Sequence, residues 1–140
     1  MAKPEKPDTL DPEAEPEEAE DLDFEIEFYE RVIERSPDCV DVLMALGDDY
    51  TKAGRYREGL EIDLKLAKLR ANDPIVHYNL ACSHSLLGQI DEALEALRRA
   101  IDLGYRDFAH MQRDPDLENL RRDPRYLALL EEALKKTLGR

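Results

Sequence analysis

The chain repeats its pattern of small and apolar residues at an interval of 34 positions. Shifting the sequence against itself by that interval places Leu46 and Gly47 on Leu80 and Ala81. A fixed period of about 20 to 50 residues is typical of stacked structural repeats that bury their apolar faces against one another. The period therefore predicts an all-α helical array, which presents an extended surface to its surroundings.

Helix-capping residues, prolines and glycines predict where the helices begin and end. An N-capping side chain precedes a proline at Ser36, Asp73, Asp114 and Asp123, and proline suits the first helical turn because it lacks an N–H group. Gly54, Gly88 and Gly104 stand where helices should stop. We expect helices at about 22–35, 38–53, 56–71, 74–87, 90–103 and 124–137, with shorter helical pieces near 106–112 and 115–121.

The residues within each repeat resemble the tetratricopeptide signature. That signature reads Trp-x2-Leu-Gly-x2-Tyr, then Ala-x3-Phe and Pro, and Leu43-x2-Leu46-Gly47-x2-Tyr50 is similar to its first half. The resemblance implies a tetratricopeptide-repeat array, an α-α superhelix of about two and a half repeats and a C-terminal capping helix. Its parts are a half repeat at 22–37, repeats at 40–73 and 74–107, and a degenerate repeat with the capping helix at 108–140.

The segment from Gly104 to Leu138 is expected to cover the C-terminal end of the array. Its apolar side chains at Leu117, Leu120, Tyr126, Leu130 and Leu134 should face the preceding helices. The basic side chains at Arg121, Arg122, Lys135 and Lys136 should stay in water. This division predicts a cap that is apolar inside and polar outside, as the ends of repeat arrays require.

The charge of the chain is concentrated at its start. The net charge is −13, and residues 1–23 hold ten acidic side chains against Lys3 and Lys6. A stretch so acidic and poor in large apolar groups cannot offset its ordering entropy, so we predict a disordered acidic tail at 1–21. The acidic balance argues against nucleic acid and membrane partners. With neither a signal sequence nor a long apolar run, a cytoplasmic protein is expected.

The family resemblance implies a non-enzymatic scaffold or adaptor that binds a protein partner. The first helix of each repeat would line a concave groove that accepts a peptide or a basic or amphipathic helix. The groove residues implied by position are Asp41, Met44, Asp48, Lys52, Tyr78, Asn79, Cys82, Leu86 and Arg113. Met44, Tyr78 and Leu86 would be its apolar anchors. Alternatively, the chain is a regulatory or assembly subunit that docks into a larger complex through its end helices.

Some family members clamp the terminal carboxylate of chaperones with lysines, asparagines and an arginine. Asn79 and Arg113 fall on two of those five positions, but Met44, Asp48 and Ala109 occupy the others. An aspartate there would repel a carboxylate, so a partner that carries Lys or Arg fits better.

Catalytic and metal sites have little support in the sequence, and no cofactor is expected. His77, His84 and Cys82 could suggest metal ligands, but both histidines replace aromatic residues of the signature, which favours packing roles. Asp63 replaces a large seam residue and must find a partner if it is buried. We expect a hydrogen bond from Asp63 to His77 or His84. A catalytic Asp-His pair is the weaker alternative, because no nucleophile is evident beside it.

Overall fold

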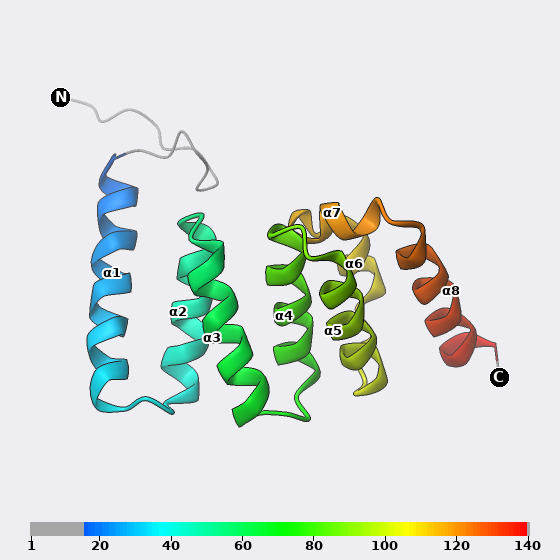
Figure 1. Ribbon diagram of the computed structural model, residues 1–140, viewed down its shortest axis with the longest axis horizontal. Helices are drawn as coiled ribbons and strands as arrows, with labels where there is room; N and C mark the ends of the chain where they lie inside the picture. Colours follow the sequence, from blue (N-terminus) through cyan, green and yellow to red (C-terminus); the bar gives the residue numbers. More distant parts are fainter. Residues whose placement is uncertain (1–15, 140) are drawn as a thin grey trace.

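The computed structural model describes residues 16–139 as a row of helices, with no strand among these residues (Figure 1). The helices are α1 (Pro16–Arg35), α2 (Val40–Lys52), α3 (Tyr56–Leu69), α4 (Pro74–Leu86), α5 (Ile90–Asp102), α6 (Phe108–Arg113), the 3-10 turn η1 (Pro115–Leu117), α7 (Glu118–Arg121) and α8 (Pro124–Leu138). Within the described range, every helix is too short or too polar to cross a membrane. The all-α prediction is confirmed.

Three of the four predicted caps start a helix or turn. The carboxylates of Asp73, Asp114 and Asp123 each accept a hydrogen bond from the backbone N–H two residues further on, at 2.9 to 3.0 Å. The prediction at Ser36 is wrong, because α2 begins only at Val40 and its cap residue makes no side-chain hydrogen bond. The residues after Ser36 form a turn instead of a first helical turn.

The small residues of the repeat allow helices to approach closely. A Cβ atom added at Gly47 would lie 3.2 Å from Ile62 Cγ2 and 3.3 Å from Asp63 Oδ1, both on α3. The predicted helix stops at Gly54, Gly88 and Gly104 have φ angles of 77°, 74° and 117°, a region that favours glycine. Glycine thus allows the close contact between α2 and α3 and also allows the turns that end the helices.

Helix α1 begins at Pro16, six residues before the predicted start. Acidic side chains are favourable near a helix N-terminus, and Leu22 and Ile26 anchor the helix against Leu46 and Tyr50 of α2. Residues 16–21, predicted as the end of the acidic tail, are therefore helical. The rest of that predicted tail lies outside the described residues.

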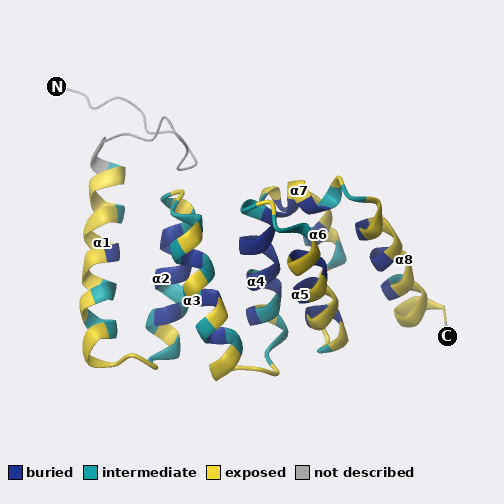
Figure 2. Cartoon of the chain, viewed as in Figure 1, coloured by how far each residue is buried: buried dark blue, intermediate teal, exposed yellow. Residues whose placement is uncertain are grey.

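The helices pack in sequence order, α1 on α2, α2 with α3, α3 on α4 and α4 with α5. The largest apolar cluster joins α4 and α5 to the segment from α6 to α8, and the buried residues line the inner sides of the row (Figure 2). The predicted capping residues Leu117, Leu120, Tyr126 and Leu130 are buried, and Leu134 is partly buried against them. The C-terminal segment thus closes one end of the array as predicted.

Arg121 departs from the prediction that it stays in water. It is half-buried, and its Nη1 atom donates to the carbonyl oxygens of Met111 and Asp114 at 2.7 and 2.8 Å. The guanidinium therefore satisfies carbonyl groups left open where α6 ends. Arg122, Lys135 and Lys136 are exposed, as predicted.

Candidate functional site

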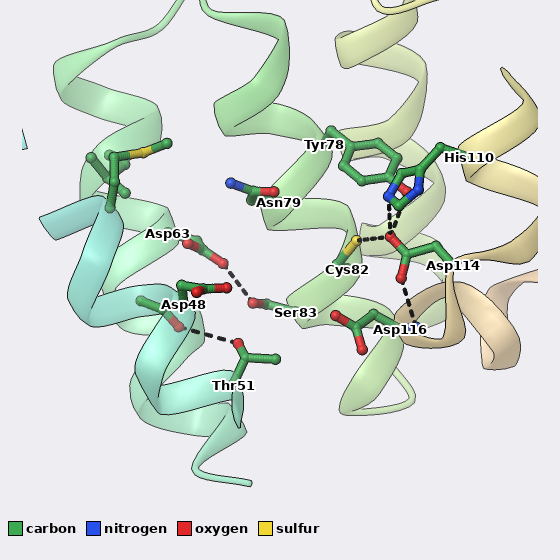
Figure 3. Close-up of a pocket in the computed structure, with 13 residues that line it drawn as sticks. Asp48, Thr51, Asp63, Tyr78, Asn79, Cys82, Ser83, His110, Asp114 and Asp116 are labelled. Atoms are coloured by element: carbon green, nitrogen blue, oxygen red, sulfur yellow. Dashed lines mark hydrogen bonds and ion pairs between the residues drawn. The ribbon is translucent and has the colours of Figure 1, made fainter. Parts of the chain in front are cut away.

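A groove opens between α2 and α4, with α3 beneath it and the segment of α6 and η1 at one side (Figure 3). It encloses a cavity of about 310 Å³. The residues that line it are Met44, Gly47, Asp48, Thr51, Asp63, Leu66, Tyr78, Asn79, Cys82, Ser83, His110, Asp114 and Asp116. We call this feature the α2–α4 groove.

The structure brings five of the nine predicted groove residues to this cavity. Met44 and Asp48 reach it from α2, and Tyr78, Asn79 and Cys82 reach it from α4. These residues share the cavity because α2 and α4 are the first helices of neighbouring repeats. The predicted α2–α4 pairing of these side chains is therefore present in the fold.

The other four predicted residues, Asp41, Lys52, Leu86 and Arg113, do not line the cavity. Lys52 lies beside it, with its ammonium 3.1 Å from the Asp48 carboxylate, but both side chains are more than half exposed. An exposed pair of this kind contributes little to stability. Arg113 is exposed on α6 and is not part of the lining to which Asn79 belongs, so the cavity holds only one of the two residues at clamp positions.

Tyr78 is a wall of the groove and not a free anchor. Its side chain is only 5% exposed, and its ring stacks on Tyr105 with centroids 4.4 Å apart. Its hydroxyl donates a 2.7 Å hydrogen bond to Asp114, and burial raises the pKa of this hydroxyl. The expectation that Tyr78 offers its ring to a partner is corrected, because the α6–η1 segment folds back over that part of α4.

Asp114 holds the α6–η1 segment against α4. One carboxylate oxygen accepts from the Asp116 backbone, and the other accepts from Tyr78 and lies 3.1 Å from Nε2 of His110. Cys82, a free thiol, lies 3.8 Å from the same oxygen. The chain positions these groups at one place although more than thirty residues separate Cys82 from Asp114.

Cys82, Asp114 and Asp116 form the group of metal-ligand types that the described residues bring together, with donor atoms within 4.8 Å of one another. The Asp114 oxygen that faces Cys82 already accepts from Tyr78 and lies 3.1 Å from His110 Nε2, so a metal ion bound there would compete with these contacts. Burial also raises the pKa of the Cys82 thiol, as do the negative charges of the two aspartates. This arrangement favours a packing role for Cys82 over metal ligation.

Asp63 bonds to Ser83 and not to a histidine. Ser83 Oγ donates to Asp63 Oδ2 at 2.5 Å, whereas His84 Nδ1 lies 2.7 Å from the Gln89 side-chain oxygen and His77 Nε2 lies 2.8 Å from the Ala71 carbonyl. Successive residues of a helix point about 100° apart, so when Ser83 faces α3 its neighbour His84 faces elsewhere. The predicted Asp63–histidine bond is wrong, and with it the Asp-His pair.

The groove is strongly acidic. Its lining includes Asp48, Asp63, Asp114 and Asp116, and no lysine or arginine among the residues that the structure describes. Burial raises the pKa of Asp63 to about 6, and burial together with the charges of Asp114 and Asp48 raises the pKa of Asp116. Both shifts mark carboxylates that a cation in the groove would stabilise.

Sequence reasoning missed several lining residues, chiefly His110, Asp114 and Asp116. The Asp114-Pro115 step reads locally as a helix cap, and it does cap η1. Its second role is to close one side of the groove against α4. This role depends on a contact between distant parts of the chain, which no local sequence pattern indicates. The sequence also did not indicate that Ser83, between Cys82 and His84, is the partner of Asp63.

Comparison with known proteins agrees with the helical pairs. A family model for the tetratricopeptide repeat matches residues 74–107, which hold α4 and α5. The chain is also 35% identical over 92 residues to a chloroplastic protein from Arabidopsis thaliana. That match covers 61% of this chain, and the chain spans 27% of the length of the relative.

Proposed function

We propose, from the premise that this chain is a tetratricopeptide-repeat protein, that its α2–α4 groove binds a segment of a protein partner carrying a lysine or arginine side chain. Tetratricopeptide repeats stack into extended surfaces that bind proteins, and proteins of this family are generally interaction modules without catalytic activity. To that general role we add a binding place, the α2–α4 groove, and a chemical class of partner, a segment with a basic side chain.

The observation that carries the proposal is the cavity lined by four aspartates. Asp48 is exposed at the rim, Asp63 forms part of the floor, and Asp116 lies on the α6–η1 side. A cationic side chain entering between them would meet acceptors from three directions. Charge complementarity of this kind steers association and excludes acidic partners.

Apolar and amide groups support the same proposal. Met44 and Asn79 are half-buried at the groove, and Leu66 lies beneath Met44. A methionine adapts to different apolar contacts, and an asparagine side chain can bond to a peptide backbone. The groove can therefore hold the stem of a lysine or arginine along with its charged head.

Binding of a cation should depend on pH because of Asp63. Its pKa of about 6 in the free protein means that it is largely protonated at pH 5 and largely ionised at pH 7. A bound cation favours the ionised form, so binding below pH 6 requires release of a proton. Affinity should therefore rise from about pH 5 to about pH 7 and then level off.

The test is selection of ligands from a random peptide library displayed on phage, followed by calorimetry with the selected synthetic peptides. Selected sequences should contain Lys or Arg, and Asp48→Asn should weaken them by about three- to tenfold. Asp102→Asn, the same change on an exposed residue of α5, should leave the affinity unchanged. Peptides that lack basic residues, or that lose equal affinity in both variants, would refute the proposal.

A further inference from the structure

The outer face of α1 carries two exposed phenylalanines. Phe24 is 66% exposed and Phe28 is 50% exposed, although the helix has a well-formed apolar face of its own. That inner face consists of Leu22, Ile26 and Tyr29, which pack against α2. Because residues four apart on a helix lie on one side, Phe24 and Phe28 form a single apolar patch on the side away from α2.

Helix α1 stands at one end of the row, and its outer side is exposed along most of its length (Figure 2). In a repeat array each inner helix is covered by a neighbour on both sides, whereas an end helix has one free face that is normally polar. An open hollow of about 330 Å³ lies beside Phe28 and is bordered by Val32, Glu34 and the two arginines Arg31 and Arg35. The apolar patch therefore faces away from the array and has an open hollow beside Phe28.

The charged residues on the outer face of α1 differ in sign between its two ends. Glu20 precedes Phe24 by four residues, and Arg31 and Arg35 follow Phe28 by three and seven, so all five lie within one face of the helix. Along the centre of this stripe of five residues the charge is acidic toward the N-terminus and basic toward the C-terminus, and the exposed acids Glu27 and Glu34 lie on one flank of it. When two such stripes run in opposite directions, the acidic end of each lies opposite the basic end of the other.

We propose that α1 is a homodimerisation face, on which the α1 helices of two copies pack antiparallel through Phe24 and Phe28. With Phe24 of one copy against Phe28 of the other, Glu20 falls within one residue of the level of Arg31 on the second copy. The two-fold symmetry repeats the same pair at the other end. A second copy therefore covers the apolar patch and pairs Glu20 with Arg31 at both of its ends.

The dimer should be of moderate strength and should leave the α2–α4 groove free. A contact between one pair of helices buries less than the roughly 1,200 Å² of standard interfaces, so association in the micromolar range is expected. The groove residues Met44, Asp48 and Asn79 take no part in the proposed face. Dimerisation and peptide binding can thus be tested separately.

Sedimentation equilibrium of the full chain, from about 1 to about 500 μM, tests the proposal. The average mass should rise with concentration from 16.1 kDa toward twice that value. Phe28→Ser should raise the dissociation constant by about tenfold or more. Leu127→Ser, which removes a leucine that is 56% exposed on α8 at the other end of the row, is the matched control and should leave it unchanged.

A charge exchange tests the antiparallel register and does not depend on removing an apolar group. Glu20→Arg alone and Arg31→Glu alone should each weaken association by creating like-charged pairs, and the double variant should restore it. Circular dichroism verifies that each variant keeps its helices. The proposal is overturned by a wild-type chain that stays at 16.1 kDa throughout, by equal weakening in Leu127→Ser, or by a double variant that fails to recover.

Discussion

Replacing Asp63 by asparagine should stabilise the protein at neutral pH and remove part of its pH dependence. Asp63 is 7% exposed, and one of its oxygens accepts from Ser83. Asparagine has nearly the same shape and keeps a carbonyl oxygen for that hydrogen bond, but it carries no charge. The change therefore isolates the cost of a buried carboxylate in the seam between α3 and α4.

The magnitude follows from the shift of the pKa of Asp63 from 3.8 to about 6. The folded state binds the proton more tightly than the unfolded state, so the stability from this proton is full below about pH 4 and is lost as the pH rises through 6. A difference of one between the pKa values of the folded and unfolded states corresponds to about 1.36 kcal/mol. The free energy of unfolding of Asp63→Asn relative to wild type should thus increase by about 2–3 kcal/mol between pH 4 and pH 8.

Urea unfolding of both proteins, followed by circular dichroism at intervals from pH 4 to pH 8, measures this difference. Comparing the two proteins at each pH cancels the titration of the many other carboxylates. Ser83→Ala is the companion variant, because it removes the hydrogen bond that favours ionised Asp63 and should shift the transition to higher pH. A difference between Asp63→Asn and wild type that stays constant across this range would refute the reasoning.

Three further changes test other parts of the fold. Gly47→Leu should cost about 1–3 kcal/mol by overpacking the seam against α3, and an unchanged urea midpoint would contradict the close approach. Asp49→Asn should stabilise the protein above pH 7 but not below pH 4, because the carboxyl is 4% exposed and burial and Glu25 raise its pKa to about 7; equal stability of variant and wild type at pH 8 would contradict this. Arg121→Met should cost about 1–3 kcal/mol by leaving carbonyl groups of α6 and its cap without a donor, and a melting temperature equal to that of wild type would show that water replaces it.

Features set by neighbouring residues were predictable from the sequence. The Asp-Pro steps at Asp73 and Asp123 start helices because the cap and the proline act within one turn. The Gly47 seam was predictable because the 34-residue period repeats it at Ala81. Ser36 has the same local chemistry but does not start a helix, so a capping residue is not sufficient by itself.

Features that depend on the C-terminal segment folding back against α4 could not be predicted from the sequence. The family resemblance implies an open groove along α4, and nothing local indicates that α6 and η1 cover Tyr78 there. The same folding back brings Arg121 to the carbonyls of Met111 and Asp114. The partner of Asp63 depended on the rotation of α4, which decides between Ser83 and its neighbour His84. The cytoplasmic location stays a prediction.

Chemical-shift mapping is the most direct test of whether the α2–α4 groove receives the cationic side chain of a partner. A selected peptide containing Lys or Arg is titrated into the isotope-labelled protein, and the backbone amide signals are followed. We expect the largest shifts at Asp48, Asn79 and Asp116, and we expect them to shrink when the peptide's basic residue is replaced by norleucine. Shifts concentrated on α1 or α8, with these three amides unmoved, would contradict it.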